Sequence, residues 1–166
     1  MADQLKTLAA ANFFLSKGAA EGVPIDPLKL QKLVYFAHGW HLAVTGEPLI
    51  DDPVEAWPYG PVIPILYREF KRFGSAPITQ LAYATGPSGE FYPPLPTDAL
   101  TISVLEKVWE QYGRYSAVQL SNLSHEPGSP WEVAKGKGQG GKLRNEDIHR
   151  FFFETSLSHR AKAGDA

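Results

Sequence analysis

The stretch that decides the fold is residues 25–42, which read IDPLKLQKLVYFAHGWHL. Asp26 is a suitable N-cap, and Pro27 follows at the first helical position, where its missing N–H costs no hydrogen bond. Apolar residues then recur with helical spacing until Gly46, a residue that commonly ends a helix. The stretch therefore predicts one long, well-delimited helix.

Apolar residues occupy two sides of this predicted helix. A second ridge, nearly opposite the main face, consists of Leu28, Tyr35 and Leu42. A helix with two apolar sides is either central in the fold or leaves one ridge for a partner. Periodicity alone does not choose between these two alternatives. The main face holds Leu30, Leu33, Val34, Ala37, Trp40, His41 and Val44.

Further helical patterns lie on both sides of this helix. The Gly- and Pro-rich residues 86–96 are expected to be a loop. The sequence predicts a mainly α fold, a compact single domain over residues 1–166 with about seven helices and one or two short β-strands near residues 49–58. Its core is expected over about 5–157, with a frayed tail at 159–166. The other expected helices cover residues 5–15, Tyr59-Gly60-Pro61 to about Phe73, 98–112, two short segments capped by Ser116 and Ser129, and a last helix capped by Asn145 that runs through Leu157.

Composition excludes several classes of protein. The chain has 166 residues, with 16 basic and 18 acidic side chains, a net charge of −2 and no cysteine. The lack of cysteine excludes a disulfide scaffold, a thiolate zinc site and a cysteine nucleophile. No apolar run reaches the roughly 18–20 residues that span a bilayer, and the first residues do not read as a signal peptide. We therefore expect a cytoplasmic protein that does not enter the membrane.

The histidines and acidic residues near the long helix are the first candidates for chemistry. His38 and His41 are three residues apart, and Asp51, Asp52 and Glu55 follow them in the sequence. Zinc sites and acid–base pairs use these residue types, but the spacing matches no known metal or catalytic motif. We expect no catalytic residue and no metal site here.

The C-terminal part of the chain holds the second candidate for chemistry. Residues 136–142 read GKGQGGK, which has the spacing of a phosphate loop but lacks the Ser or Thr that should follow the lysine. The basic residues of segment 135–166 leave weak contact with phosphates as an alternative. No recognition-helix motif accompanies them, so we expect neither a nucleotide cofactor nor nucleic-acid binding.

An ordered set of short motifs resembles a known family. The motifs are KLQKL at 29–33, Gly39-Trp40, EAWPYGP at 55–61, and Pro130-Trp131. Together they resemble the Panacea domain family, also called SocA-like antitoxins or GepA-type phage-associated proteins. The resemblance covers about residues 5–157. It implies a bacterial or prophage antitoxin that neutralises a toxin from the neighbouring gene by direct binding, and it brings no catalytic site with it.

The implied toxin partner turns several residues into contact candidates. A phage-associated adaptor or regulatory interaction module is the alternative, followed by a DNA-binding regulator and a hydrolase. The oligomeric state is not predicted. The candidate toxin contacts are Leu28, Tyr35, Leu42, Trp57, Tyr59 and Tyr67. The motif residues expected to be structural are Lys29, Leu30, Gln31, Lys32, Leu33, Trp40, Gly60, Pro61, Pro130 and Trp131.

Overall fold

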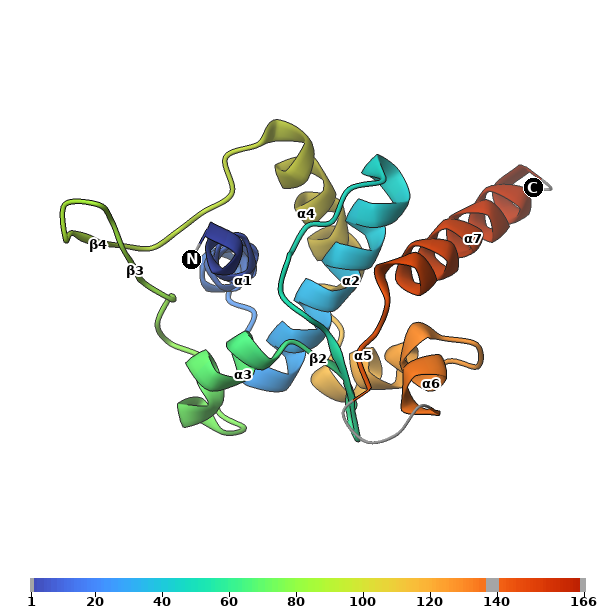
Figure 1. Ribbon diagram of the computed structural model, residues 1–166, viewed down its shortest axis with the longest axis horizontal. Helices are drawn as coiled ribbons and strands as arrows, with labels where there is room; N and C mark the ends of the chain where they lie inside the picture. Colours follow the sequence, from blue (N-terminus) through green and yellow to red (C-terminus); the bar gives the residue numbers. More distant parts are fainter. Residues whose placement is uncertain (1, 137–140, 165–166) are drawn as a thin grey trace.

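The computed structural model describes residues 2–136 and 141–164, with side chains from Leu5 onward. Within these ranges the chain forms seven α-helices and two small antiparallel sheets of two strands each, which confirms the expected mainly α fold. None of these helices is long and apolar enough to cross a membrane. The elements are α1 (Ala2–Glu21), α2 (Pro27–Thr45), β1 (Glu55–Trp57), β2 (Gly60–Val62), α3 (Pro64–Phe70), the 3-10 helix η1 (Lys71–Phe73), β3 (Ala84–Thr85), β4 (Phe91–Tyr92), α4 (Ala99–Tyr112), α5 (Ala117–Ser124), α6 (Pro130–Lys135) and α7 (Asn145–Gly164) (Figure 1).

Helix α2 is the centre of the fold, with α1, α4, α5 and α7 packed around it (Figure 1). Its start is the predicted one, because the Asp26 carboxylate accepts a hydrogen bond from the backbone N–H of Lys29 at 2.8 Å. Gly46 ends it in the left-handed conformation, with φ of 75°. A Cβ at Gly39 would collide with the Phe152 ring, so this glycine lets α7 approach the α2 backbone closely. Central packing explains why α2 is apolar on two sides.

The second ridge of α2 is therefore mostly core rather than interface. Tyr35 is 1% exposed and Leu42 is 4% exposed. Tyr35 packs edge-on against Phe152 of α7, with ring centroids 5.9 Å apart. Leu28, at the start of the helix, stays half-buried. A partner that binds this fold does not reach Tyr35 or Leu42, so these two residues leave the set of candidate toxin contacts.

The first small sheet corrects the expected start of the third helix. Glu55 pairs with Val62 and Trp57 with Gly60, so the residues after Tyr59 form a strand rather than a helical turn. Gly60 has φ of 112°, which is incompatible with a helix. Helix α3 begins only at Pro64, and its last turn tightens into η1. The short strand expected near residues 49–58 is present as β1.

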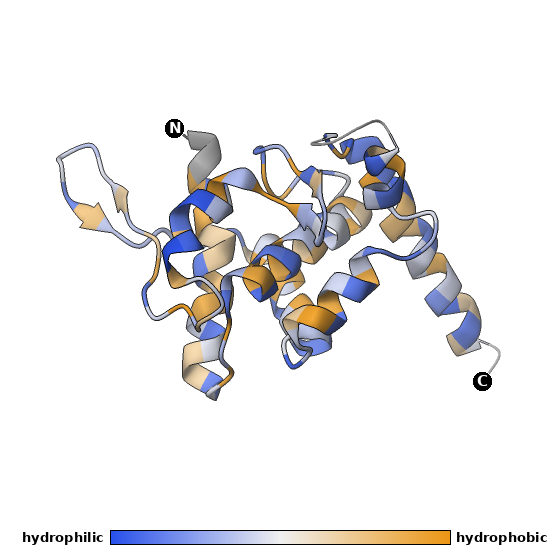
Figure 2. Ribbon diagram, turned by 90° about the horizontal axis from the view of Figure 1, so that it is seen from below, coloured by the Kyte–Doolittle hydropathy of each residue, from blue (hydrophilic) through white to orange (hydrophobic). Residues whose placement is uncertain are grey.

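A second hairpin overlaps residues 86–96, which the sequence predicts to be a loop, and begins two residues before them. Ala84 pairs with Tyr92 and Thr85 with Phe91, and Gly89 takes φ of 82° in the turn between them. The hairpin extends away from the helices (Figures 1 and 2). The buried side chain of Asn12 in α1 holds both ends of the segment that carries this hairpin. Its amide group bonds to the backbone of Ala82 and to the carbonyl of Pro94 at 2.8–2.9 Å.

Two helix boundaries also differ from the sequence expectation. Helix α1 continues past Leu15 to Glu21, so Gly18 lies inside the helix instead of ending it. A Cβ at Gly18 would come 2.6 Å from the carbonyl oxygen of Val23. Asn145 is the first helical residue of α7 rather than its cap, and its side chain bonds to His38 instead. Helix α7 continues to Gly164, so residues 159–164, where a frayed tail is expected, are part of this helix.

Candidate functional site

The turn of the first hairpin packs closely against the helices. Pro58 and Tyr59 form this turn, between Trp57 at the end of β1 and Gly60 at the start of β2. A Cβ at Gly60 would lie 2.6 Å from the Ser124 hydroxyl oxygen and 3.0 Å from Lys32 Cε. Only glycine combines the positive φ with this close approach. The turn is thus seated against α5 and against the N-terminal half of α2.

Side chains from three helices hold the backbone of this hairpin. Every second carbonyl along the chain, at positions 57, 59, 61 and 63, accepts a side-chain hydrogen bond. Buried carbonyls need such partners, and each bond adds about 1 kcal/mol net. The four bonds are Trp131 Nε1 to the Trp57 carbonyl at 2.7 Å, the Ser121 hydroxyl to that of Tyr59 at 2.7 Å, Lys32 Nζ to that of Pro61 at 3.0 Å, and Gln31 Nε2 to that of Ile63 at 3.1 Å.

Gln31 and Lys32 act on the hairpin from the buried side of α2. Gln31 also accepts a hydrogen bond from the Ile63 N–H at 2.8 Å, so its amide group replaces a strand partner. Lys32 is 0% exposed, and burial lowers its pKa to about 7. No carboxylate within the described ranges pairs with it. With this pKa the amine is charged in about half of the molecules at pH 7, and it donates its hydrogen bond to Pro61 in either form.

His125 borders the same cluster at the end of α5. Its ring meets the Trp131 ring edge-on, with centroids 4.1 Å apart. Burial, and then the charge of Lys32, lower the pKa of this histidine. Its Nε2 is buried and has no hydrogen-bond partner. The neutral ring therefore packs against Trp131 beside the hairpin.

Two aromatic side chains of the supported hairpin and one of helix α3 reach the surface. Tyr59 at the turn is 73% exposed, and Tyr67 of α3 is 45% exposed. The half-buried Trp57 lies between the core and the surface, and its ring centroid is 5.0 Å from that of Tyr67. We name Trp57, Tyr59 and Tyr67 the hairpin face. Aromatic side chains on a rigid backbone are typical anchors of protein–protein interfaces.

The structure brings two of the six candidate contacts together, because the rings of Trp57 and Tyr67 meet, and Tyr59 is exposed two residues after Trp57. Tyr35 and Leu42 lie in the core, and Leu28 is half-buried at the start of α2. The residues expected to be structural occupy three places. Lys29, Leu30, Gln31, Lys32 and Leu33 are buried in α2, Gly60 and Pro61 begin strand β2, and Pro130 and Trp131 begin α6. Trp40 of α2 donates from Nε1 to the Tyr112 hydroxyl at 2.9 Å.

Sequence reasoning missed the serines of α5, whereas it expected Gln31 and Lys32 of α2 to be structural, as their bonds to the hairpin now show. Ser121 bonds to the Tyr59 carbonyl, and Ser124 closes the space above Gly60. Serines are common in all parts of proteins, so their presence in the sequence does not indicate a role in supporting the hairpin. Gln31 and Lys32 could be recognised from the sequence, because polar residues inside a helix that is apolar on two sides require hydrogen-bond partners.

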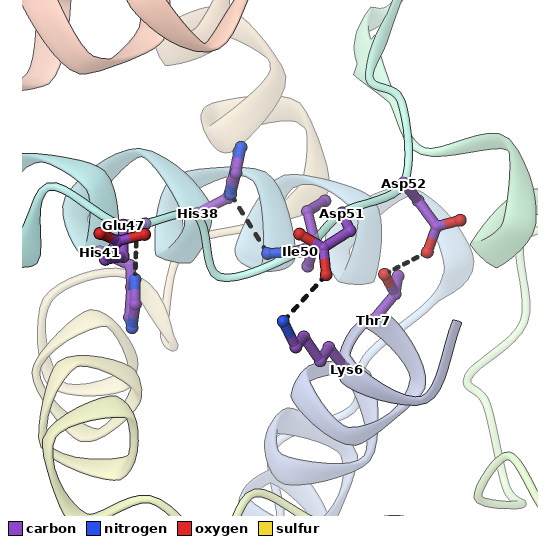
Figure 3. A network of polar contacts seen from close by, with 8 residues as sticks. All are labelled: Lys6, Thr7, His38, His41, Glu47, Ile50, Asp51 and Asp52. Atoms are coloured by element: carbon purple, nitrogen blue, oxygen red, sulfur yellow. Dashed lines mark hydrogen bonds and ion pairs between the residues drawn. The ribbon is translucent and has the colours of Figure 1, made fainter. Parts of the chain in front are cut away.

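The histidines and acidic residues considered for metal or acid–base chemistry hold the connection from α2 to β1 in place (Figure 3). His38 pairs through Nε2 with Asn145 at 3.0 Å and through Nδ1 with the Ile50 N–H at 3.4 Å, and burial lowers its pKa to about 4. His41 bonds through Nδ1 to the Glu47 carbonyl at 2.7 Å. The segment's two aspartates bind α1, Asp51 to Lys6 at 2.9 Å and Asp52 to the Thr7 hydroxyl at 2.5 Å.

The remaining chemical candidates do not form a site in the described residues. The Glu55 carboxylate accepts a hydrogen bond from Trp57 Nε1 at 2.8 Å and so supports the hairpin face. Across the described ranges no group of three or more His, Cys, Asp or Glu side chains is placed to hold a metal ion. The phosphate-loop candidate at 136–142 includes residues 137–140, which lie outside the described ranges.

Comparison with known proteins gives two matches. A family model described as "Antitoxin SocA-like, Panacea domain" matches residues 30–132, which include the hairpin and all four side chains that hold its carbonyls. The protein "Antitoxin SocA" of Caulobacter vibrioides (strain NA1000 / CB15N) is 41% identical over 133 residues. That alignment covers 78% of this chain and 71% of the relative. No solved structure matches the chain.

Proposed function

Since this chain belongs to the SocA-like Panacea family of antitoxins, we propose that it neutralises a toxin encoded by the neighbouring gene through direct protein–protein binding. The name of the Caulobacter relative supports an antitoxin role. The protein would act as a single Panacea-like domain, in the cytoplasm where the toxin is made, and without catalysing a reaction. Neutralisation by binding requires a surface that recognises the toxin and little else.

The hairpin face is the surface that we assign to the toxin. The single observation that carries this assignment is the rigid support beneath exposed aromatic rings: four side chains from α2, α5 and α6 fix the hairpin backbone. A side chain that is already ordered loses little conformational entropy on binding, so more of its contact energy appears as affinity. Trp57, Tyr59 and Tyr67 are therefore the proposed contacts, and Leu28 is a secondary candidate.

A growth experiment tests the proposed function. The adjacent open reading frame is induced in a host with and without this protein, and growth is followed. We expect growth arrest with the neighbour alone and restored growth when this chain is present, followed by co-purification of the two proteins. A toxic neighbour whose effect is unchanged by this chain contradicts the proposal. A harmless neighbour that still co-purifies supports the alternative of an adaptor or regulatory interaction module.

A further inference from the structure

We propose that the toxin segment bound by the hairpin face is acidic, because four unpaired cations surround this face. The inference rests on the proposed function and adds the chemistry of the partner. The four side chains are Arg68, Lys71, Lys135 and Lys142, which we name the basic arc. All four are exposed.

Two members of the basic arc follow Tyr67 along α3 and η1. Leu66 and Phe70 are buried, so they define the side of this segment that faces the core. Lys71 comes four residues after Tyr67 and continues its side of the helix, and Arg68 is adjacent. Both cations therefore extend the hairpin face at its α3 edge.

The other two members lie beside β1 and α6. Lys142 is the antiparallel bridge partner of Glu55, and directly opposed residues in such a bridge point to the same side of a sheet. Trp57, two residues after Glu55, shares that side. Lys135 places its Nζ 4.6 Å from the centre of the Trp131 ring, and Trp131 is bonded to the Trp57 carbonyl. The cations thus reach the hairpin face from its other edge.

The members of the basic arc have no ion-pair partner among the described residues, a property that they share with several other cations, and what sets them apart is that they lie around one aromatic surface. Five cations elsewhere, Lys6, Lys17, Arg114, Arg144 and Arg150, pair with a carboxylate within 4.0 Å. Arg68, Lys71, Lys135 and Lys142 form no such pair although acidic residues outnumber basic ones in the whole chain.

Nearby carboxylates do not neutralise the arc. Glu55 is the one carboxylate on the same side of the sheet, and it accepts a hydrogen bond from Trp57 Nε1. Glu132 is turned toward the start of α6, where it accepts from the Gly128 N–H at 3.0 Å. Glu69 is two residues after Tyr67, about 200° around α3 from it, and is adjacent to Arg68. Four cations against these three carboxylates, two of which already accept hydrogen bonds, leave an excess of positive charge around the hairpin face on a chain of net charge −2.

On such a surface the aromatic rings and the charges contribute to binding in different ways. Burial of the aromatic rings supplies most of the affinity, whereas complementary charges speed association and reject partners of the wrong sign. An acidic toxin segment complements the charges of the basic arc while it contacts the aromatic rings. The effect of the charges weakens with salt because exposed pairs are screened over about 10 Å at 0.1 M ionic strength.

The test compares charge reversal on the arc with charge reversal elsewhere. The probe is the purified product of the adjacent gene, and the readout is its association rate and Kd with each variant by surface plasmon resonance. Arg68→Glu/Lys71→Glu is the test variant. Lys107→Glu/Arg160→Glu is the matched control, since both residues are exposed and form no ion pair within the described ranges. Arg68→Lys/Lys71→Arg keeps the charge, and thermal melts confirm that each variant folds.

We expect the test variant to associate about tenfold or more slowly at about 50 mM salt, and the difference to shrink at about 500 mM salt. The control and the charge-keeping variant should stay within about twofold of wild type. Equal association rates for test and control variants overturn the acidic-segment proposal and leave the antitoxin proposal standing. A neighbour product that neither binds nor is neutralised by wild type overturns both. If the test variant loses binding to labelled DNA or RNA but not to the toxin, the arc serves nucleic acid and the proposal is wrong.

Discussion

The two hairpins of this protein have similar local sequences but very different support. Both are short, rich in Gly and Pro, and turn through a glycine with positive φ, Gly60 in the first and Gly89 in the second. The first is held by side chains of three helices, whereas the bonds of the second turn are its own, such as Gly86 N–H to the Glu90 carbonyl at 2.8 Å. Figure 2 shows the second hairpin away from the helices.

The difference teaches which exposed aromatic side chains are prepared for binding. Phe91 of the second hairpin is 78% exposed, slightly more than Tyr59 at 73%. Exposure alone would rank Phe91 first. Because ordering a mobile segment on binding costs free energy, the supported Tyr59 is the better anchor. The predictions below test this contrast.

The largest expected effect is on the two glycine turns. Gly60→Ala should lower the free energy of unfolding by about 2–4 kcal/mol, because the new methyl group meets Ser124 and Lys32 at a positive φ. Gly89→Ala is the matched control, since nothing lies within 4 Å of its Cβ, and should cost about 1 kcal/mol for backbone strain alone. Urea denaturation measures both. Equal losses would mean that the first hairpin is no better seated than the second.

The next effect is a pH dependence that belongs to the first hairpin only. Burial lowers the pKa of Lys32 to about 7 in the folded state, against 10.5 for an ordinary lysine. Between these values the unfolded chain binds a proton that the folded chain lacks, so this lysine makes stability rise with pH by up to about 1.4 kcal/mol per unit. Below about pH 7 both states are protonated, so the lysine adds nothing more to the slope and its destabilising effect is fully present.

Lys32→Met should remove this slope. Urea midpoints of wild type and variant at about pH 7.5, 8.5 and 9.5 measure the effect, and their difference cancels the contribution of Lys29, whose pKa burial also lowers. The support of the second hairpin, Asn12, does not titrate, so Asn12→Ala should lower stability without changing the slope. Parallel pH profiles for wild type and Lys32→Met would contradict the buried, uncompensated state of this lysine.

The smallest expected effect is at the tip of the second hairpin. Phe91→Ser should change the free energy of unfolding by no more than about 0.5 kcal/mol, because the ring is mostly exposed in the folded protein. Urea denaturation alongside the glycine variants gives the comparison. A loss above about 1 kcal/mol would show that this ring packs on the body of the protein in solution.

The sequence predicted those parts of the fold that depend on local signals. Asp26 and Pro27 fixed the start of α2, and Ser116 with Gln119 formed the expected capping box of α5. The family resemblance is likewise confirmed. The contact of Trp57 with Tyr67 followed from their closeness along the chain.

The misread parts depend on contacts between distant segments. The strand at Gly60 exists because Gln31, Ser121 and Trp131 supply its hydrogen bonds from positions 32 to 74 residues away. The sequence of the turn itself does not indicate which distant side chains donate these hydrogen bonds. Tyr35 looked like part of a free ridge because periodicity shows that a helix side is apolar, not that α7 covers it.

The most direct test of the account is the affinity of two matched variants for the toxin. Isothermal titration of the neighbour-encoded toxin against Tyr59→Ala and Phe91→Ala compares two exposed aromatic residues on differently supported hairpins. We predict that Tyr59→Ala weakens binding by about tenfold or more, which is above 1 kcal/mol, with an unchanged urea midpoint, and that Phe91→Ala binds as wild type does. Wild-type affinity for Tyr59→Ala, or a loss confined to Phe91→Ala, would contradict the assignment of the hairpin face as the toxin-binding surface.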